Sequence, residues 1–220
     1  MRTYGDRCGV ARALDVVGER WALLIVRELL LGAKRFTDLR AGLPHVSPDV
    51  LAQRLRELER DGIVGRRRLA PPAGSRVYEL TERGLDLEAV ILALGRFGSS
   101  APFPPGKARL GTDSAILALM TLFDPSEAEG LRATYELRLG EHRFHARIAE
   151  GRLDLARGRA YRPDASIETD PATLAAVLWH GHRLSEALRS GDMKVEGSGA
   201  LVTRFLRLFP LPEVAPSADA

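Results

Sequence analysis

The sequence predicts an α+β protein with two domains, a mainly helical one that contains a single hairpin and a second one in which helices cover an antiparallel sheet. At 220 residues the chain has the length of two ordinary domains. Apolar residues recur at helical spacing through most of the first hundred residues, whereas alternating runs typical of strands follow a proline-rich segment. Such segregation of helices and strands along a chain favours the α+β class.

The composition excludes several classes of protein. Apolar residues make up 45% and charged residues 28%, which is typical of globular proteins and unlike disordered chains. No run approaches the roughly 18 uncharged apolar residues of a membrane span, and residues 1–9 lack the apolar core of a signal peptide. We therefore expect a cytoplasmic protein without a membrane span. The single cysteine, Cys8, excludes an intrachain disulfide and a multi-cysteine zinc site.

Basic charge is concentrated in the first half of the chain. Residues 1–100 carry 17 basic and 13 acidic groups, whereas residues 101–220 carry 15 and 16. Only three of the 32 basic residues are lysines, and arginine is the side chain suited to bidentate contacts with phosphate and guanine. The excess therefore suggests a nucleic-acid partner, although a genome-wide bias toward arginine explains composition alone equally well.

The first part of the chain predicts four helices. Apolar spacing indicates helices at residues 10–17 and 21–31, broken at Gly18 and ended by Gly32. A short helix at residues 36–41 is followed by a longer one from residue 48 to residue 61.

The fourth helix has clear ends and two distinct faces. Ser47 is the expected N-cap, Pro48 occupies the first helical position and Gly62 stands just past the end. Leucines at positions 51, 55 and 58 form one buried stripe. Polar residues occupy the opposite face, namely Asp49, Gln53, Arg56 and Arg60.

A basic hairpin follows this helix. Two β-prone runs, residues 63–69 and 76–80, flank the turn-forming PPAGS. A short helix, a tight connection and a polar-faced helix match the helix-turn-helix scheme, and the hairpin is then its wing. The wing arginines are expected to contact phosphates or the minor groove, namely Arg66, Arg67, Arg68 and Arg76.

These blocks resemble the HxlR-type winged helix-turn-helix transcriptional regulators over about residues 7–97. The resemblance lies in Cys8, GERWALLIVRELLLGAKRFTDL from Gly18, SPDVLAQRLRELERDGIVGR from Ser47 and VYELTERG from Val77. It implies a homodimer, formed by the first helix and the helix at residues 82–97, that binds a palindromic site on double-stranded DNA. The candidate DNA contacts are Arg35, Thr37, Ser47, Asp49, Gln53, Arg56, Arg60, Arg66, Arg67, Arg68 and Arg76.

Several of these residues have simpler interpretations. An arginine-bearing helix face is often just solvated, Arg54 suits a structural ion pair as well as a base contact, and Trp21 is expected to fill the core. Cys8 is a candidate redox sensor by the family resemblance, because a thiol near Arg7 and a helix N-terminus favours the thiolate. The alternative for Cys8 is a small buried hydrophobe.

The segment GSSAPFPPG, residues 98–106, marks a domain boundary because its prolines cannot continue a helix. We expect a DNA-binding and dimerisation domain at residues 1–99, a linker at 100–109, a second domain at 110–210 and a flexible tail at 211–220. In the second domain the pattern predicts an apolar helix near residues 113–123 and a meander of four antiparallel strands over residues 134–169. Two helices, a short strand and a closing apolar helix complete it.

The second domain resembles the sterol carrier protein type two domain. The matching elements are EGRLDLARG, PDASIETD, Gly181, SGDMKVEG and the closing helix. The resemblance implies a hydrophobic tunnel that holds an apolar small molecule, although each lining residue is also ordinary core. The candidate lining residues are Leu117, Met120, Phe123, Leu174, Leu178, Trp179, Leu188, Phe205 and Phe209.

The sequence favours a ligand-responsive DNA-binding regulator, with repression as the expected sign. No catalytic fingerprint occurs and neither histidine pair has the spacing of a metal site, so we expect no enzyme activity, no cofactor and no metal. One alternative is a lipid-binding or scaffold protein whose winged domain mediates dimerisation. Another is an enzyme that acts on acyl or sulfate esters, but the chain leaves no room for its catalytic domain.

Overall fold

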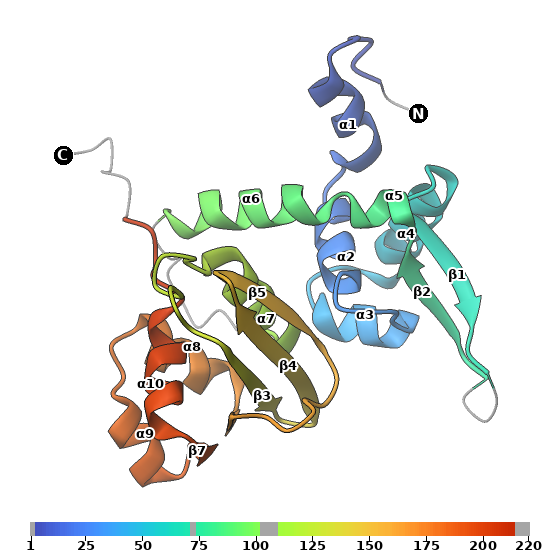
Figure 1. Ribbon diagram of the computed structural model, residues 1–220. Helices are drawn as coiled ribbons and strands as arrows, with labels where there is room; N and C mark the ends of the chain where they lie inside the picture. The colour runs from blue at the N-terminus through green and yellow to red at the C-terminus, as the bar shows by residue number, and fades with distance from the viewer. Residues whose placement is uncertain (1–2, 71–73, 102–109, 214–220) are drawn as a thin grey trace. The chain divides into compact units, whose positions relative to one another are not determined.

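The computed structural model describes residues 3–70, 74–101 and 110–213 (Figure 1). The chain divides into two compact units, Met1–Ile91 and Leu92–Ala220, here called unit 1 and unit 2. Most of the expected linker and tail lies outside the described residues, so those two expectations stay predictions.

Unit 1 contains the four expected helices and the hairpin. Its elements are α1 (Gly9–Val17), α2 (Ala22–Leu29), α3 (Phe36–Gly42), α4 (Pro48–Arg60), β1 (Val64–Arg68), β2 (Arg76–Leu80), α5 (Glu82–Leu85) and the start of α6 (Glu88–Ser99). The strands β1 and β2 pair in antiparallel fashion. The helices surround one apolar core, to which α2 contributes Ile25 and Val26 and α4 its leucines.

The residues at the two ends of α4 adopt the conformations that the sequence predicts. Ser47 Oγ accepts a hydrogen bond from Val50 N at 3.3 Å, and Gly62 adopts a φ of +71° just past the end. Leu51, Leu55 and Leu58 are at most 1% exposed. Because the apolar stripe is fully used by the core, the opposite face of α4 is left outside it.

Two details of unit 1 differ from the expectation. The single helix expected at residues 82–97 is two helices, α5 and α6. Thr81 explains the separate start of α5, because its Oγ accepts from Gly84 N at 3.1 Å and donates to Gly62 O at 2.7 Å. Trp21 is only partly buried against the core, where it caps α2 with a φ of +79°.

Unit 2 contains one five-stranded sheet and four further helices. Its elements are α7 (Thr112–Leu122), β3 (Ala133–Leu139), β4 (His142–Ala149), β5 (Arg152–Arg157), β6 (Ala165–Thr169), α8 (Pro171–Trp179), α9 (Leu184–Ser190), β7 (Met193–Gly197) and α10 (Gly199–Arg207). The strand order is β5-β4-β3-β6-β7. The α+β class is confirmed.

The expectation of a wholly antiparallel sheet is wrong. Strand β6 pairs with β3 in parallel, with Tyr135 opposite Ala165, while the other pairs are antiparallel. The connection at residues 158–164 carries the chain from one edge strand, β5, past β4 and β3. Alternating apolar residues predict a strand but not its direction, which is why the sequence did not indicate this pairing.

The core of unit 2 lies between the sheet and α10. Tyr135 on β3 and Phe205 on α10 are both fully buried, with ring centroids 4.7 Å apart. The Tyr135 hydroxyl donates to Leu201 O at 3.2 Å, so its polar end is satisfied inside this core.

Burial raises the pKa of Tyr135 to about 12, which predicts a pH-dependent stability. An unfolded tyrosine ionises at about pH 10, whereas the folded Tyr135 keeps its proton at that pH. Folding stability is therefore complete below pH 10 and falls as the pH rises toward 12, by up to about 2 kcal/mol. Urea unfolding of wild type and Tyr135→Phe over this range measures it. An equal loss of stability in both proteins would contradict the assignment to Tyr135.

Candidate nucleic-acid interface

The outward face of α4 is a connected row of polar side chains. Gln53 Nε2 donates to Glu57 Oε1 at 2.7 Å, and Arg56 donates to Gln53 Oε1 at 2.6 Å. Arg60 pairs with Asp61 at 3.1 Å. Gln53, Arg56 and Arg60 are exposed, so this row holds its amide and guanidinium groups outside the core in a defined arrangement.

Arg54 is a structural residue. It forms ion pairs with Glu57 and, at 3.3 Å, with Glu19 ahead of α2, and its side chain is only 20% exposed. Of the two interpretations of Arg54, the ion pair is confirmed.

The wing arginines fall into two pairs that differ in their partners. Arg66 is paired with Glu59 and lies over the ring of Tyr78, while Arg67 Nε is 2.9 Å from Glu79. The other two are cross-strand partners, Arg68 opposite Arg76, and neither has an acidic partner among the described residues.

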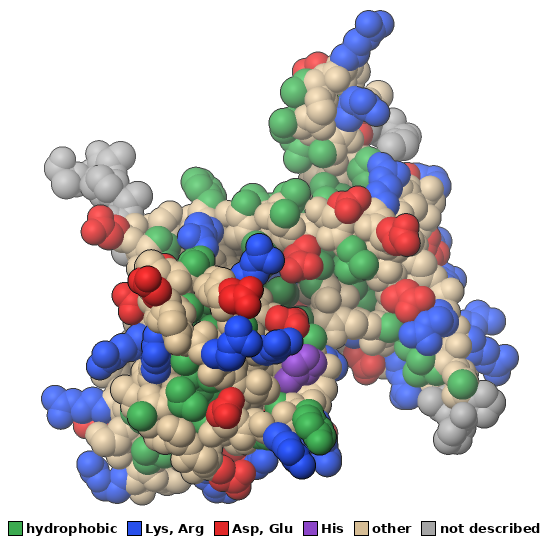
Figure 2. All heavy atoms as spheres, viewed as in Figure 1, with side chains coloured by type: hydrophobic (Ala, Val, Ile, Leu, Met, Phe, Trp, Pro, Cys, Tyr) green, Lys and Arg blue, Asp and Glu red, His purple; other side chains and the backbone are tan. Residues whose placement is uncertain are grey.

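Arg68 and Arg76 make the outer part of the wing a favourable place for an anion to bind. Within the part of the hairpin that the structure describes, Arg68 Nε donates to the backbone oxygen Gly74 O at 3.1 Å. Like charges opposite each other on neighbouring strands repel, and a bound phosphate would relieve that repulsion. Lys and Arg side chains gather along this hairpin (Figure 2).

The remaining candidate DNA contacts lie at helix starts. Arg35 and Thr37 are exposed at the start of α3, and Asp49 is exposed in the first turn of α4. Ser47 uses its oxygen as the N-cap acceptor, which leaves the hydroxyl proton to donate. All eleven candidates therefore lie on α3, α4, their N-caps or the wing.

A buried carboxylate that the sequence did not indicate links α2 to the wing. Glu28 in α2 is 3% exposed and accepts from Arg27 at 2.8 Å and from Lys34 Nζ. Lys34 also exchanges two backbone hydrogen bonds with Tyr78 of the wing, at 2.9 and 2.8 Å. The only signal in the sequence is one acidic residue within an apolar helical run.

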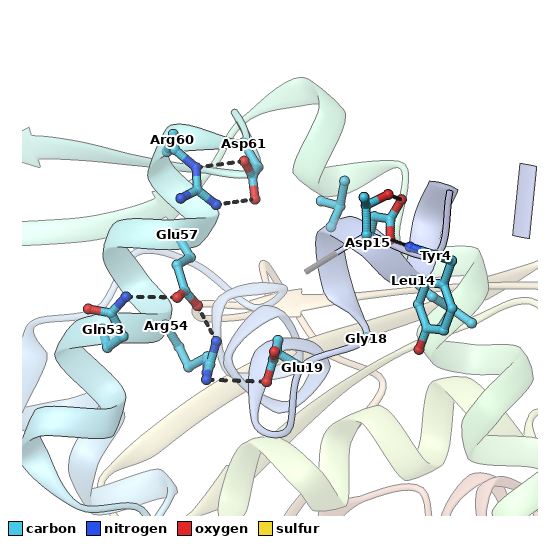
Figure 3. A pocket seen from close by; sticks show the side chains of 12 residues that line it. Tyr4, Leu14, Asp15, Gly18, Glu19, Gln53, Arg54, Glu57, Arg60 and Asp61 are labelled. Carbon is cyan, nitrogen blue, oxygen red and sulfur yellow. Dashed lines mark hydrogen bonds and ion pairs between the residues drawn. The ribbon is translucent and has the colours of Figure 1, made fainter. Parts of the chain in front are cut away.

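A cavity of about 570 Å³ lies between α1 and α4 (Figure 3). Gln53, Arg54, Arg60 and their acidic partners line one side, and Tyr4 and Leu14 line the other. Gln53, Arg54 and Arg60 all bond to acidic side chains along this cavity, so it differs in character from the apolar tunnel expected in unit 2.

The candidate effector residues of unit 2 mostly pack together. Leu117, Leu174, Phe205 and Phe209 are buried, and the Phe209 ring centroid lies 5.0 Å from Phe205 and 6.2 Å from Phe123. Met120, Leu178 and Trp179 are half-buried, and Trp179 Nε1 donates to Phe209 O at 2.9 Å. Leu188 is 42% exposed on α9, outside this buried set. An apolar ligand must therefore separate aromatic side chains that now touch.

Cys8 is exposed at the N-terminus of α1, so its interpretation as a small buried hydrophobe is wrong. Hydrogen bonds from the backbone amides of Ala11 and Val10 lower the pKa of the thiol.

This shift predicts that Cys8 reacts with iodoacetamide faster in the folded chain than in the urea-unfolded chain at pH 7. The thiolate is the reacting form, and the helix amides that stabilise it are lost on unfolding. The alkylation rate against pH, followed by mass spectrometry, measures the difference. Equal rates in both states would show that the amides have no such effect.

Fold and site together define a winged helix-turn-helix protein with an appended α+β domain. The model of the HxlR-like helix-turn-helix family matches residues 16–102, and that of the SCP-2 sterol transfer family matches residues 118–210. The chain belongs to the HxlR-like helix-turn-helix family and carries a domain of the SCP-2 sterol transfer family in its second part. Membership of the first family implies DNA binding.

Relatives match the first part of the chain. The uncharacterized HTH-type transcriptional regulator YvaP of Bacillus subtilis is 37% identical over 40% of this chain and 82% of its own length. The HTH-type transcriptional regulator YodB of the same organism is 41% identical over 36% and 70%. A solved structure, the redox regulator HypR in its oxidized form, is 35% identical over 44% of this chain and 100% of its own, with a TM-score of 0.41.

Within residues 3–70, 74–101 and 110–213, no group of three or more His, Cys, Asp or Glu side chains is arranged to hold a metal ion. No helix in the same ranges is both long and apolar enough to cross a membrane.

Proposed function

We propose that this protein is a homodimeric transcriptional regulator that binds operator DNA through α4 and the wing, and whose affinity for DNA responds to an apolar molecule held in unit 2. The observation that carries the proposal is the exposed polar row on α4 beside two wing arginines, Arg68 and Arg76, for which the described residues provide no acidic partner. An α-helix of this kind fits the major groove, where Gln and Arg read adenine and guanine.

Exposed apolar side chains on α1 and α6 support the homodimer. No residue of α6 is buried, and Phe97 is 79% exposed. On α1, Val10 is 68% exposed. Apolar side chains stand out along both helices in Figure 2. Such a surface is unfavourable in water, and a second copy of the chain would bury it and place two recognition helices on one duplex.

The family of the second domain and the aromatic cluster of unit 2 support an apolar effector. The effector shifts DNA affinity only if it binds the DNA-competent and DNA-incompetent states with different strength. Promoter occlusion, and hence repression, is the expected outcome of operator binding.

The test starts from genomic DNA. Fragments that the purified protein retains are sequenced, with and without a cell lipid extract, and the affinity for one retained fragment is measured against salt. The proposal predicts saturable binding with a steep negative slope of log affinity against log salt, because phosphate contacts release counterions. A scaffold protein would retain no fragment preferentially, and that result would overturn the proposal. Native mass spectrometry of the same preparation tests for a co-purifying apolar compound.

A further inference from the structure

Helix α6 belongs to both units of the chain. Residues 88–91 fall in unit 1 and residues 92–99 in unit 2. Near its start, Leu87 and Ile91 pack against the core that also holds the leucines of α4. In its second half, Gly95 and Arg96 contact α7. One continuous helix therefore contacts the core of unit 1 near its start and α7 in its second half.

The contact with α7 is unusually close at Gly95. A Cβ atom at this position would lie 2.9 Å from Oγ1 and 3.1 Å from Cγ2 of Thr121, which is 6% exposed. Arg96 adds a hydrogen bond to Thr121 O at 2.8 Å. Glycine in a helix interior is less favourable than alanine, so its presence here calls for a packing reason. The close approach to Thr121 supplies one.

Gly98 on the same helix is different, because a Cβ there meets no atom within 4 Å. Helix α6 therefore contains two glycines, of which Gly95 is required by packing and Gly98 is not. This contrast supplies a matched control.

We propose that the Gly95–Thr121 contact is the joint through which unit 2 sets the position of α6, and thereby the affinity of the dimer for DNA. Thr121 lies one helical turn after Leu117 and directly after Met120, two candidate effector residues on α7. A ligand that displaces these side chains moves α7, and Thr121 carries the displacement to α6. The expected effect on DNA affinity rests on the proposed function, whereas the existence of the joint does not.

Three variants test the joint. In Gly95→Ala the new methyl group clashes with both branches of Thr121, whereas Gly98→Ala adds the same group in open space. Both changes favour the isolated helix to a similar extent, because alanine has the higher helix propensity. The double variant Gly95→Ala with Thr121→Ala removes the clash, because the Thr121 Cβ lies 3.6 Å from the added Cβ, an ordinary contact.

The first readout is hydrogen–deuterium exchange of the intact chain, which requires neither DNA nor a ligand. Gly95→Ala should lower the protection of amides at residues 92–99, since the helix is displaced from α7. Gly98→Ala should leave protection equal or higher, and the double variant should restore it. If Gly95→Ala raises protection as Gly98→Ala does, then helix propensity alone determines the protection of these amides, and no joint exists.

The second readout is affinity for a DNA fragment that the wild-type protein retains. Gly95→Ala should change this affinity by about fivefold or more, the scale of typical couplings between sites, while the double variant stays within about twofold of wild type. If all three bind alike, unit 2 does not act through this joint. If wild type itself binds no fragment preferentially, the proposed function fails, whereas the exchange data still decide whether the joint exists.

Discussion

Replacing Gln53 and Arg56 together by alanine is expected to remove most of the preference of this protein for its own site. Both side chains are exposed on α4 and hydrogen-bonded to each other, which presents them as one unit. A well-placed bidentate contact to a base contributes about 1–3 kcal/mol of discrimination, so each lost contact lowers the ratio of specific to non-specific affinity by about 5- to 150-fold. Affinity for unrelated DNA should change little by comparison.

The measurement is a competition between the retained fragment and unrelated DNA at fixed salt. Arg54→Ala is not a useful control, because it breaks ion pairs with Glu19 and Glu57 and perturbs the fold. Arg132→Ala in unit 2 removes an exposed arginine of similar type and should leave the ratio unchanged. A double variant that keeps the wild-type ratio would show that α4 does not read bases.

Replacing Arg68 and Arg76 of the wing by alanine is expected to weaken binding to all DNA sequences alike. Each lost phosphate contact reduces the slope of log affinity against log salt by about 0.9, so Arg68→Ala with Arg76→Ala should reduce it by about 1.8. At 0.15 M salt this corresponds to roughly 30-fold weaker binding.

The other wing pair is a control with the same change in charge. Arg66 and Arg67 are already paired with Glu59 and Glu79, so binding DNA must first break or share those contacts. Arg66→Ala with Arg67→Ala should therefore reduce the slope and the affinity less. Equal effects of the two double variants would show that the ion pairs do not limit access to phosphate.

Local signals allowed the sequence to predict α4 well. Ser47, Pro48 and Gly62 mark its ends by backbone chemistry that depends on few neighbours, and the leucine spacing assigns its buried face. Properties that depend on distant partners could not be predicted in this way.

The direction of β6, the buried Glu28 and the pairing of two wing arginines depend on distant partners. The acids that neutralise Arg66 and Arg67 come from α4 and β2, and nothing in the run of arginines indicates them. The close approach of Gly84 in α5 to Ile63, where a Cβ would lie 2.2 Å from the carbonyl oxygen, also depends on a distant partner. In unit 2 the same limit applies to Leu188, whose apolar character suggested a lining position although it is exposed.

Affinity cleavage can show whether the outward face of α4 lies against a DNA duplex. A DNA-cleaving iron chelate is attached at Val50→Cys, an exposed position on α4, in a chain whose Cys8 is replaced by serine. The control carries the chelate at Ser126→Cys, exposed in unit 2. With the chelate at Val50→Cys, we expect cuts inside the retained fragment at two clusters about one helical turn of DNA apart. With the chelate at Ser126→Cys, we expect no cuts. Cutting no stronger from Val50→Cys than from Ser126→Cys would contradict the placement of α4 against the duplex.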